Sequence, residues 1–355
     1  MMPSARTNPS KKIINVLIVD DSILMAELIE DIISSDPQMH VVGIAQNGKE
    51  AVEKAGIYHP DVITMDIAMG VLDGVQATKQ IMVENPTPIL IVTNSISSVN
   101  SEKIFHAFSF GALDVFDKNL IEFKNDQVNR DQLIRKVKCL SGIPVMPYSV
   151  HKDSYGREQR FVLGRKKTSR KIVAIVASTG GPPAIHGILK SFDTDFPCGI
   201  LIVQHISKGF EGNFKDWLND ECAIEVKIAE HNEPIRPAVA YIAPSDKHVR
   251  VNASRRIELG SDPAVGGFRP SGNILLQSVA EVYGKDAISV ILTGMGKDGA
   301  EGMMAIKKKH GVAIAQDEKS CAIFGMPKVA IEMEAANQVL SLEMIPEAIL
   351  ACLRE

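Results

Sequence analysis

The chain has 355 residues, of which 45% are hydrophobic and 23% charged, and its formal net charge at pH 7 is −4. This composition excludes a mainly disordered chain, and the length predicts two globular domains. So small a net charge excludes a protein that relies on general attraction to nucleic acid or to a membrane surface.

Cysteine usage and hydropathy predict a soluble protein of the cytoplasm. The five cysteines are an odd number and form no CxxC pair, which argues against a disulfide framework or a structural zinc site. The first dozen residues are polar and lack the apolar centre of a signal peptide. The longest uncharged stretch, residues 172–189, contains adjacent glycines and prolines and cannot form a membrane helix. We therefore expect no direct insertion into a membrane.

Residues 13–138 alternate short apolar runs with helical patterns. The apolar runs, which we expect to be strands, cover residues 14–19, 40–45, 61–65, 88–93 and 113–116. The helical patterns lie at 24–33, 47–58, 74–84, 100–108 and 128–138. Because strands buried on both faces read as unbroken apolar runs, this alternation predicts an α/β domain with a doubly wound parallel sheet.

Polar side chains follow four of these five strands. Asp20 and Asp21 come directly after the first strand and Asp66 after the third, while Thr93 ends the fourth and Lys118 follows the fifth. Ligands of open parallel sheets bind at the carboxyl ends of the strands, and three carboxylates there favour a hard cation such as Mg²⁺. A cation, a hydroxyl and an ammonium around Asp66 would suit a phosphoryl group. Each aspartate alone could instead cap the helix that follows it, but the set of five favours a phosphoryl site.

These side chains belong to motifs that resemble the receiver domain of two-component response regulators. The motifs are VDDS at 19–22, MDIAMGVLDG at 65–74 and GALDVFDK at 111–118. The resemblance implies a flavodoxin-like fold for residues 13–138 and phosphorylation by a histidine kinase. It also implies roles for five residues: phosphorylation at Asp66, Mg²⁺ binding by Asp20, Asp21 and Asp66, a switch hydroxyl at Thr93 and a phosphoryl contact from Lys118.

Residues 139–170 break the strand–helix rhythm and predict a linker. The segment holds two prolines and three glycines, and a basic run covers residues 165–171. That run could bind nucleic acid, but it lacks interleaved aromatic residues. A solvated hinge is the favoured interpretation, and no nucleic-acid partner is expected.

The strand–helix alternation resumes over residues 171–355. Strands are expected at 172–177, 199–204, 223–229, 240–244, 248–251 and 287–293. Helical patterns lie at 182–191, 210–220, 273–283, 299–309, 326–333 and 344–353. This half therefore predicts a second doubly wound, mostly parallel sheet of Rossmann-like type.

Ser178 follows the first strand of this second half directly. The glycines and prolines behind it, residues 180–183, predict a sharp turn into a helix whose first N–H groups would face a developing oxyanion. The pattern GxSxG is absent, so the hydrolase family with that nucleophile turn is not supported. Taken alone, the turn could equally bind phosphate or cap the helix.

His205 and Asp298 also follow expected strands. A lone histidine at a strand end is usually structural, and Asp298 could cap the helix at 299–309. A serine nucleophile, however, needs an adjacent base, and the base needs an orienting carboxylate. The three residues together therefore favour a Ser–His–Asp triad, with backbone N–H groups near Met295 aimed at the same carbonyl.

Six separated motifs resemble the catalytic domain of the chemotaxis receptor protein-glutamate methylesterases. They are ASTGGP at 177–182, QHISKGF at 204–210, AYIAPSDKHVRV at 240–251, FRPSGNILL at 268–276, TGMGKDG at 293–299 and AQDEKSCAIFGMP at 315–327. The resemblance covers both domains. It implies Ser178 as nucleophile, His205 as base, Asp298 as its carboxylate, the Met295 backbone as oxyanion donor and Thr179 as a neighbour of the reacting carbonyl.

Some positions depart from the family patterns. Gly70 and Asn119 stand where receiver domains usually have proline, and Val176 replaces a usual glycine two residues before the serine. Gly272 and Asn273 stand where the family often has an apolar residue and an aspartate.

The resemblance implies a phosphorylation-activated serine esterase that acts in chemotaxis adaptation. Its substrates would be glutamyl methyl esters on methyl-accepting chemoreceptors, hydrolysed to glutamate and methanol, and it would also deamidate receptor glutamines. It would need Mg²⁺ in the receiver domain and no cofactor in the esterase site. Two alternatives stay open: a phospho-dependent receptor-binding scaffold without turnover, and a hydrolase for an unrelated ester. A scaffold would have no need of the three triad residues, and an unrelated hydrolase would not explain the receiver domain.

Overall fold

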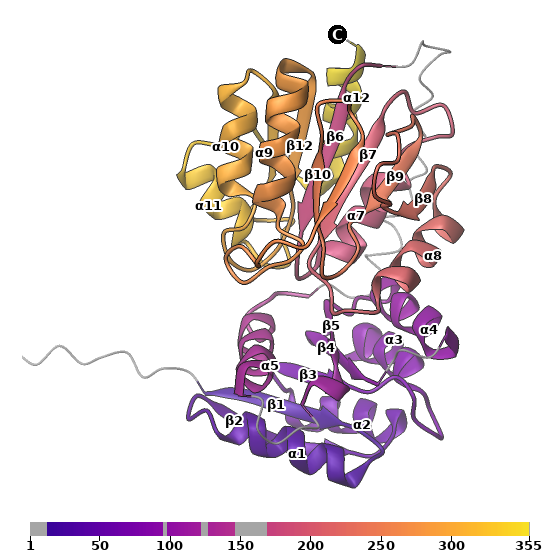
Figure 1. Cartoon of the computed structure of the whole chain (residues 1–355). Helices are drawn as coiled ribbons and strands as arrows, with labels where there is room; N and C mark the ends of the chain where they lie inside the picture. Colours follow the sequence, from indigo (N-terminus) through magenta and orange to yellow (C-terminus); the bar gives the residue numbers. More distant parts are fainter. Residues whose placement is uncertain (1–12, 95–97, 122–126, 146–168, 355) are drawn as a thin grey trace, which may run out of the picture.

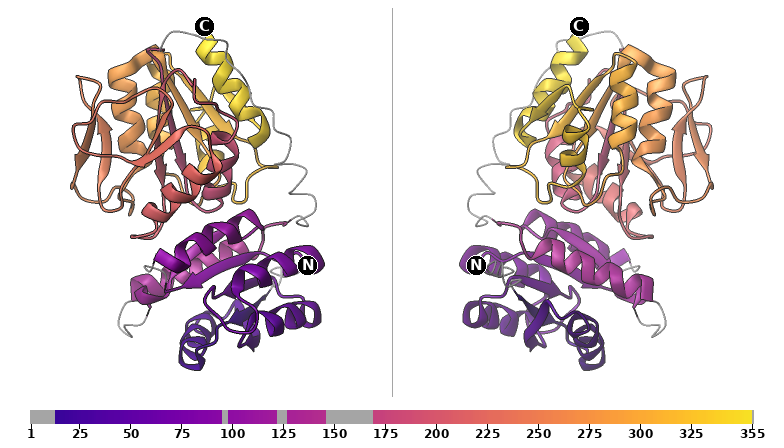
Figure 2. Two further views of the ribbon diagram at one scale, coloured as in Figure 1. Left: turned by 90° about the vertical axis from the view of Figure 1, so that its right-hand side faces the viewer. Right: turned by 90° about the vertical axis from the view of Figure 1, so that its left-hand side faces the viewer.

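The computed structural model describes residues 13–94, 98–121, 127–145 and 169–354, which form two α/β units. Each unit is built on a parallel sheet, and the N-terminal unit lies below the C-terminal one in Figure 1. Figure 2 shows the same stacking from two further sides.

The N-terminal sheet has the strand order β2-β1-β3-β4-β5, with every pair parallel. Its strands are β1 (Ile14–Val19), β2 (Met39–Ala45), β3 (Val62–Met65), β4 (Ile89–Thr93) and β5 (Asp114–Asp117). Successive side chains of β1 point to opposite faces. One face packs with α2 (Gly48–Tyr58), α3 (Gly74–Glu84) and α4 (Ser98–Ser109), and the other with α1 (Ile23–Ser34) and α5 (Gln127–Leu140). A short helix, η1 (Lys118–Leu120), follows β5.

The C-terminal sheet has seven parallel strands in the order β14-β13-β12-β6-β7-β9-β8. They are β6 (Ile172–Ala177), β7 (Gly199–Gln204), β8 (Glu225–Ile228), β9 (Val239–Ile242), β12 (Ala287–Ile291), β13 (Val312–Gln316) and β14 (Gln338–Leu340). One face packs with α7 (Gly181–Leu189), α8 (Glu211–Glu221) and α12 (Ile345–Arg354). The other packs with α9 (Gly272–Tyr283), α10 (Ala300–Lys308) and α11 (Met326–Glu332). The short helices η2 (Gly284–Asp286) and η3 (Leu342–Met344) complete the unit.

Both parallel sheets confirm the predicted fold class, but three strands were not predicted. Strand β13 has two alanines, and β14 is only three residues long, so neither presents a strong apolar run. Strand β11 (Ile257–Gly260) pairs with β10 (His248–Val251) in an antiparallel hairpin outside the main sheet. Pairing with a partner strand stabilises such short strands, and the pattern within the segment itself cannot reveal that pairing.

Two sequence predictions fall partly or wholly outside the described residues. Helix α5 ends at Leu140, two residues into the expected linker, and residues 146–168 of that linker are not described. The first dozen residues, on which the signal-peptide argument rests, are not described either. Within the described ranges, no helix is both long and apolar enough to cross a bilayer.

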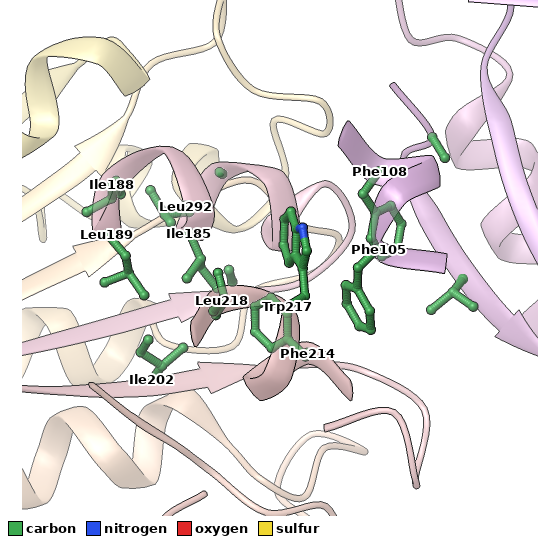
Figure 3. Close-up of a cluster of buried hydrophobic side chains, with 14 of the residues drawn as sticks. Phe105, Phe108, Ile185, Ile188, Leu189, Ile202, Phe214, Trp217, Leu218 and Leu292 are labelled. Carbon is green, nitrogen blue, oxygen red and sulfur yellow. The ribbon is translucent and has the colours of Figure 1, made fainter. Parts of the chain in front are cut away.

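One hydrophobic cluster extends through the boundary between the two units. Phe105 of α4 stacks on Trp217 and Phe214 of α8, with ring centroids 5.4 and 5.6 Å apart, respectively. Figure 3 shows these rings facing one another from the two units. Phe105 is fully buried and Trp217 is 6% exposed, so this contact places α4 firmly against the C-terminal unit.

The loop after β3 is held close to α3 by Gly74. A Cβ atom on this residue would lie 1.9 Å from the carbonyl oxygen of Asp66, so alanine does not fit. Gly70, four residues earlier, has nothing within 4 Å of the corresponding position.

We expect Gly74→Ala to destabilise the protein by about 1–3 kcal/mol, the usual range for overpacking. Thermal unfolding of the full chain, followed by calorimetry, should show a lower midpoint. Gly70→Ala is the matched control and should leave the midpoint nearly unchanged. Equal midpoints for the two variants would contradict this description of the loop.

Candidate active site and phosphorylation site

The candidate catalytic side chains lie at the carboxyl edge of the C-terminal sheet. Ser178 follows β6, His205 follows β7, and Asp298 lies in the segment between β12 and α10. Strand β6 lies between β7 on one side and β12 on the other. The chain runs from β6 to β7 first and reaches β12 later, so the direction in which strands are added to the sheet reverses at β6. Open α/β sheets bind ligands at this kind of switch point.

Backbone contacts fix the turn that carries Ser178. The Ser178 N–H donates to the carbonyl of Thr293 at 3.1 Å, and the Ser178 carbonyl accepts from Gln204 Nε2 at 2.8 Å. A Cβ atom on Gly181 would lie 1.9 Å from Gln204 Oε1, so only glycine allows helix α7 to begin this close to β7. The serine is 8% exposed.

The histidine and the aspartate form a direct pair. His205 Nε2 lies 3.0 Å from Asp298 Oδ2, and the imidazole stacks on Phe268 with centroids 4.0 Å apart and planes 8° from parallel. Because an ionised carboxylate only accepts, Nε2 carries the proton. Nδ1 is then the basic nitrogen, and it is buried without a hydrogen-bond partner among the described residues.

Asp298 is held as a carboxylate by donors from the start of α9. Ser271 Oγ donates to Oδ1 at 2.7 Å, and the N–H groups of Gly272 and Asn273 donate at 2.5 and 3.1 Å, respectively. Burial opposes the charge, but the hydrogen bonds from His205 and from α9 outweigh it and hold the pKa of Asp298 below its ordinary value. Asp298 is therefore ionised at neutral pH, with its charge facing His205.

Met295 and Thr179 both lie beside Ser178 and both contact the N-terminal unit. Gly294 approaches so closely that a Cβ atom on it would lie 2.7 Å from the Ser178 Cβ, and Met295 is the next residue. The Met295 Sδ atom is 2.9 Å from Cys139 Sγ at the end of α5. Thr179 Oγ1 donates to Asp114 Oδ2 at 2.6 Å. The Thr179 hydroxyl is thus bonded to the other unit.

A second cluster occupies the carboxyl edge of the N-terminal sheet. Lys118 Nζ lies 2.5 Å from Asp20 Oδ2 and 2.6 Å from Asp66 Oδ2, and all three side chains are buried. The exposed Asp21 completes a set of carboxylates whose oxygens lie within 4.8 Å of one another. Thr93 is buried at the end of β4, in register with Asp117 of β5.

The charges of this cluster fit a divalent cation. Asp20, Asp21 and Asp66 can carry three negative charges, and Lys118 offsets one of them. Burial raises the pKa of Asp20, and the Coulomb attraction and hydrogen bond of Lys118 offset that effect only in part. Oxygen ligands of this kind and number are those that Mg²⁺ accepts.

Sequence reasoning did not single out four residues that hold these sites in place. Gln204 bridges the serine turn to β7, Phe268 supports the histidine, Ser271 bonds the aspartate, and Asp114 contacts the serine turn from the other unit. Gln204 could have been noticed, because it is a polar residue that ends an otherwise apolar buried strand. The other three act through contacts that leave no local pattern.

Comparison with known proteins gives matches for both units. Residues 173–349 match the family model "CheB methylesterase", and residues 16–126 match "Response regulator receiver domain". A relative from Halalkalibacterium halodurans named protein-glutamate methylesterase/protein-glutamine glutaminase is 40% identical over 95% of this chain and 97% of its own length. A relative of the same name from Pyrococcus horikoshii is 37% identical over 95% of this chain and 92% of its own. The solved catalytic domain of the Thermotoga maritima CheB methylesterase is 38% identical, covers 52% of this chain and 99% of its own, and superposes with a TM-score of 0.51.

The raised pKa of Asp20 predicts a stability gain when its charge is removed. The folded state holds a proton on Asp20 more tightly than the unfolded chain does, so ionisation costs stability above the folded-state pKa. Asp20→Asn should therefore raise the melting temperature at pH 7. The gain should shrink as the pH falls through the folded-state pKa, because wild-type Asp20 then becomes neutral too.

Asp21→Asn is the control, since it removes a charge from the exposed member of the same cluster. Melting temperatures of the full chain between pH 7 and pH 4 provide the measurement. A lower melting temperature for Asp20→Asn at pH 7 would refute the assignment of a burial cost to Asp20.

Proposed function

The chain belongs to the CheB methylesterase family, and we propose that it hydrolyses glutamyl methyl esters on methyl-accepting chemoreceptors under the control of its receiver domain. The relatives' shared name and their coverage of nearly the whole chain support this proposal. The observation that carries it is the His205–Asp298 pair at 3.0 Å, at the sheet edge where the Ser178 turn begins. Deamidation of receptor glutamines is a second activity, since it proceeds through attack on the same γ-carbonyl.

In the proposed mechanism, Ser178 Oγ attacks the ester carbonyl and His205 Nδ1 accepts its proton. Asp298 stabilises the imidazolium through Nε2, and the Met295 backbone N–H stabilises the oxyanion. The imidazolium then returns its proton to the leaving group, and methanol departs. Water, activated by His205, cleaves the acyl-enzyme to glutamate. For a glutamine substrate, the leaving group is ammonia.

The receiver domain supplies the control. Asp66 is the proposed phosphoryl acceptor, and a histidine kinase is the donor. Asp20, Asp21 and Asp66 would hold Mg²⁺, which neutralises phosphoryl charge when bound. Lys118 would contact the phosphoryl oxygens, and Thr93 would supply the switch hydroxyl.

Contacts at the serine turn support closure of the active site before phosphorylation. The Gly180 N–H donates to the carbonyl of Leu113 at 3.0 Å, and Thr179 Oγ1 donates to Asp114. Together with the Phe105–Trp217 stack, these bonds keep the receiver domain against the edge where a receptor helix would have to enter. Phosphorylation of Asp66 would favour separation of the two domains.

Ser178→Ala should lower the esterase rate on the order of 10⁴-fold, because the nucleophile is removed while binding is kept. Methanol release from methylated chemoreceptor membranes measures this rate. Ser191→Ala is the control: the Ser191 hydroxyl donates to the Gly187 carbonyl near the end of α7, and its loss should leave the rate unchanged. An undiminished rate in Ser178→Ala would exclude Ser178 as nucleophile.

Methanol release should rise with a small phosphodonor plus Mg²⁺, and Asp66→Ala should remove that rise.

Phe105→Ala should raise the rate without phosphodonor, because the closed state loses about 2 kcal/mol of apolar contact, which corresponds to roughly 30-fold in population. Phe116→Leu is the control: Phe116 belongs to the receiver core on the opposite face of the sheet. Equal basal rates in Phe105→Ala and wild type would disprove inhibition through this contact.

A further inference from the structure

Val176 and Gly272 touch where strand β6 meets the start of helix α9. A Cβ atom on Gly272 would lie 2.3 Å from Cγ1 of Val176 and 2.9 Å from its Cγ2. Gly272 does not have a positive φ, so its backbone conformation does not require glycine. Glycine is therefore needed at 272 for space, and Val176 is what occupies that space.

Gly272 is also one of the donors to the catalytic carboxylate. Its N–H donates to Asp298 Oδ2 at 2.5 Å, and Oδ2 is the same oxygen that contacts His205 Nε2. Helix α9 can place its first N–H groups on Asp298 only because position 272, which faces Val176 of β6, carries no side chain. With valine at 176, any group added at 272 would push the helix start away from the carboxylate.

Val176 also lies close to the chain segment that carries Asp298. A Cβ atom on Gly299, the residue after Asp298, would lie 3.3 Å from Val176 Cγ1. Val176 is fully buried and lies two residues before Ser178 on the same strand. The Val176 side chain thus lies next to Gly272, which donates to Asp298, and next to Gly299, which follows Asp298. It projects from β6, the strand that Ser178 follows.

We propose that Val176 and Gly272 form a reciprocal size pair that positions Asp298 against His205. The pair rests on the proposed esterase function for its catalytic consequence, but its geometry does not depend on the substrate. The two residues act through Asp298 and touch no reacting atom, so they are positioning residues. Valine at 176 demands glycine at 272, and the pair can be exchanged as a unit.

A swap of the two side chains tests the pair. Gly272→Val should lower kcat about 10- to 100-fold, the cost of a displacement of about 1 Å in a catalytic group. KM should change little, because both residues are buried. Val176→Gly combined with Gly272→Val moves the same three carbons to the other side of the contact and should recover most of the lost kcat. Methanol release from methylated chemoreceptor membranes, by the full chain with phosphodonor and Mg²⁺, gives both constants.

Gly212→Val is the matched control. Gly212 lies in the first turn of α8 in the same domain, and nothing lies within 4 Å of its Cβ position. This variant should keep the wild-type kcat. Val176→Ala combined with Gly272→Ala is a second, smaller exchange for use if the valine swap does not fold. Its kcat should be higher than the kcat of Gly272→Ala alone.

A second readout is independent of turnover. The proton on His205 Nε2, hydrogen-bonded to a buried carboxylate, gives a downfield imidazole N–H resonance in the proton NMR spectrum. That resonance should shift in Gly272→Val and return in the double variant, so it tests the pair even if wild-type protein releases no methanol and the proposed function fails. Wild-type kcat and resonance in Gly272→Val would overturn the proposal, as would a folded double variant that recovers neither.

Discussion

Both candidate sites depend on one constraint of parallel sheets. Each crossover returns the chain to the same end of the sheet, so every strand finishes at one edge and the residues that follow the strands collect there. In the N-terminal sheet this edge gathers Asp20, Asp66 and Lys118. In the C-terminal sheet it gathers Ser178, His205 and Asp298, although the last two are 93 residues apart.

Strand β5 joins the two edges. Its first residue, Asp114, bonds Thr179 beside Ser178, and Lys118, directly after its last residue, pairs with Asp66. Four residues of strand span about 13 Å, so the cluster of Asp20, Asp66 and Lys118 and the serine turn are connected by one short, buried element.

Close packing shapes the candidate active site together with its polar groups. Gly181, Gly272 and Gly294 each stand where a Cβ atom would meet a neighbour at less than 3 Å. The lack of a side chain at Gly181 and Gly272 lets helices α7 and α9 begin against the strands, so that their first N–H groups donate to the Ser178 carbonyl and the Asp298 carboxylate, respectively. The negative charge of Asp298 then finds enough donors to persist in a buried position. These three glycines are therefore needed for the structure of the site, because a larger residue at any of the three positions would not fit.

The sequence by itself determined the fold class and the family, because unbroken apolar runs and the residues that follow them are local features. It also predicted the polar residues at the strand ends, such as Asp66 and Ser178. Only the tertiary structure decided which histidine nitrogen faces Asp298, that α9 surrounds this carboxylate, and that Asp114 bonds Thr179. These contacts join residues between 26 and 93 positions apart, and strands as short as β14 exist only through such pairing. The physical reason is that packing between distant segments, unlike strand periodicity, leaves no repeating pattern in the chain.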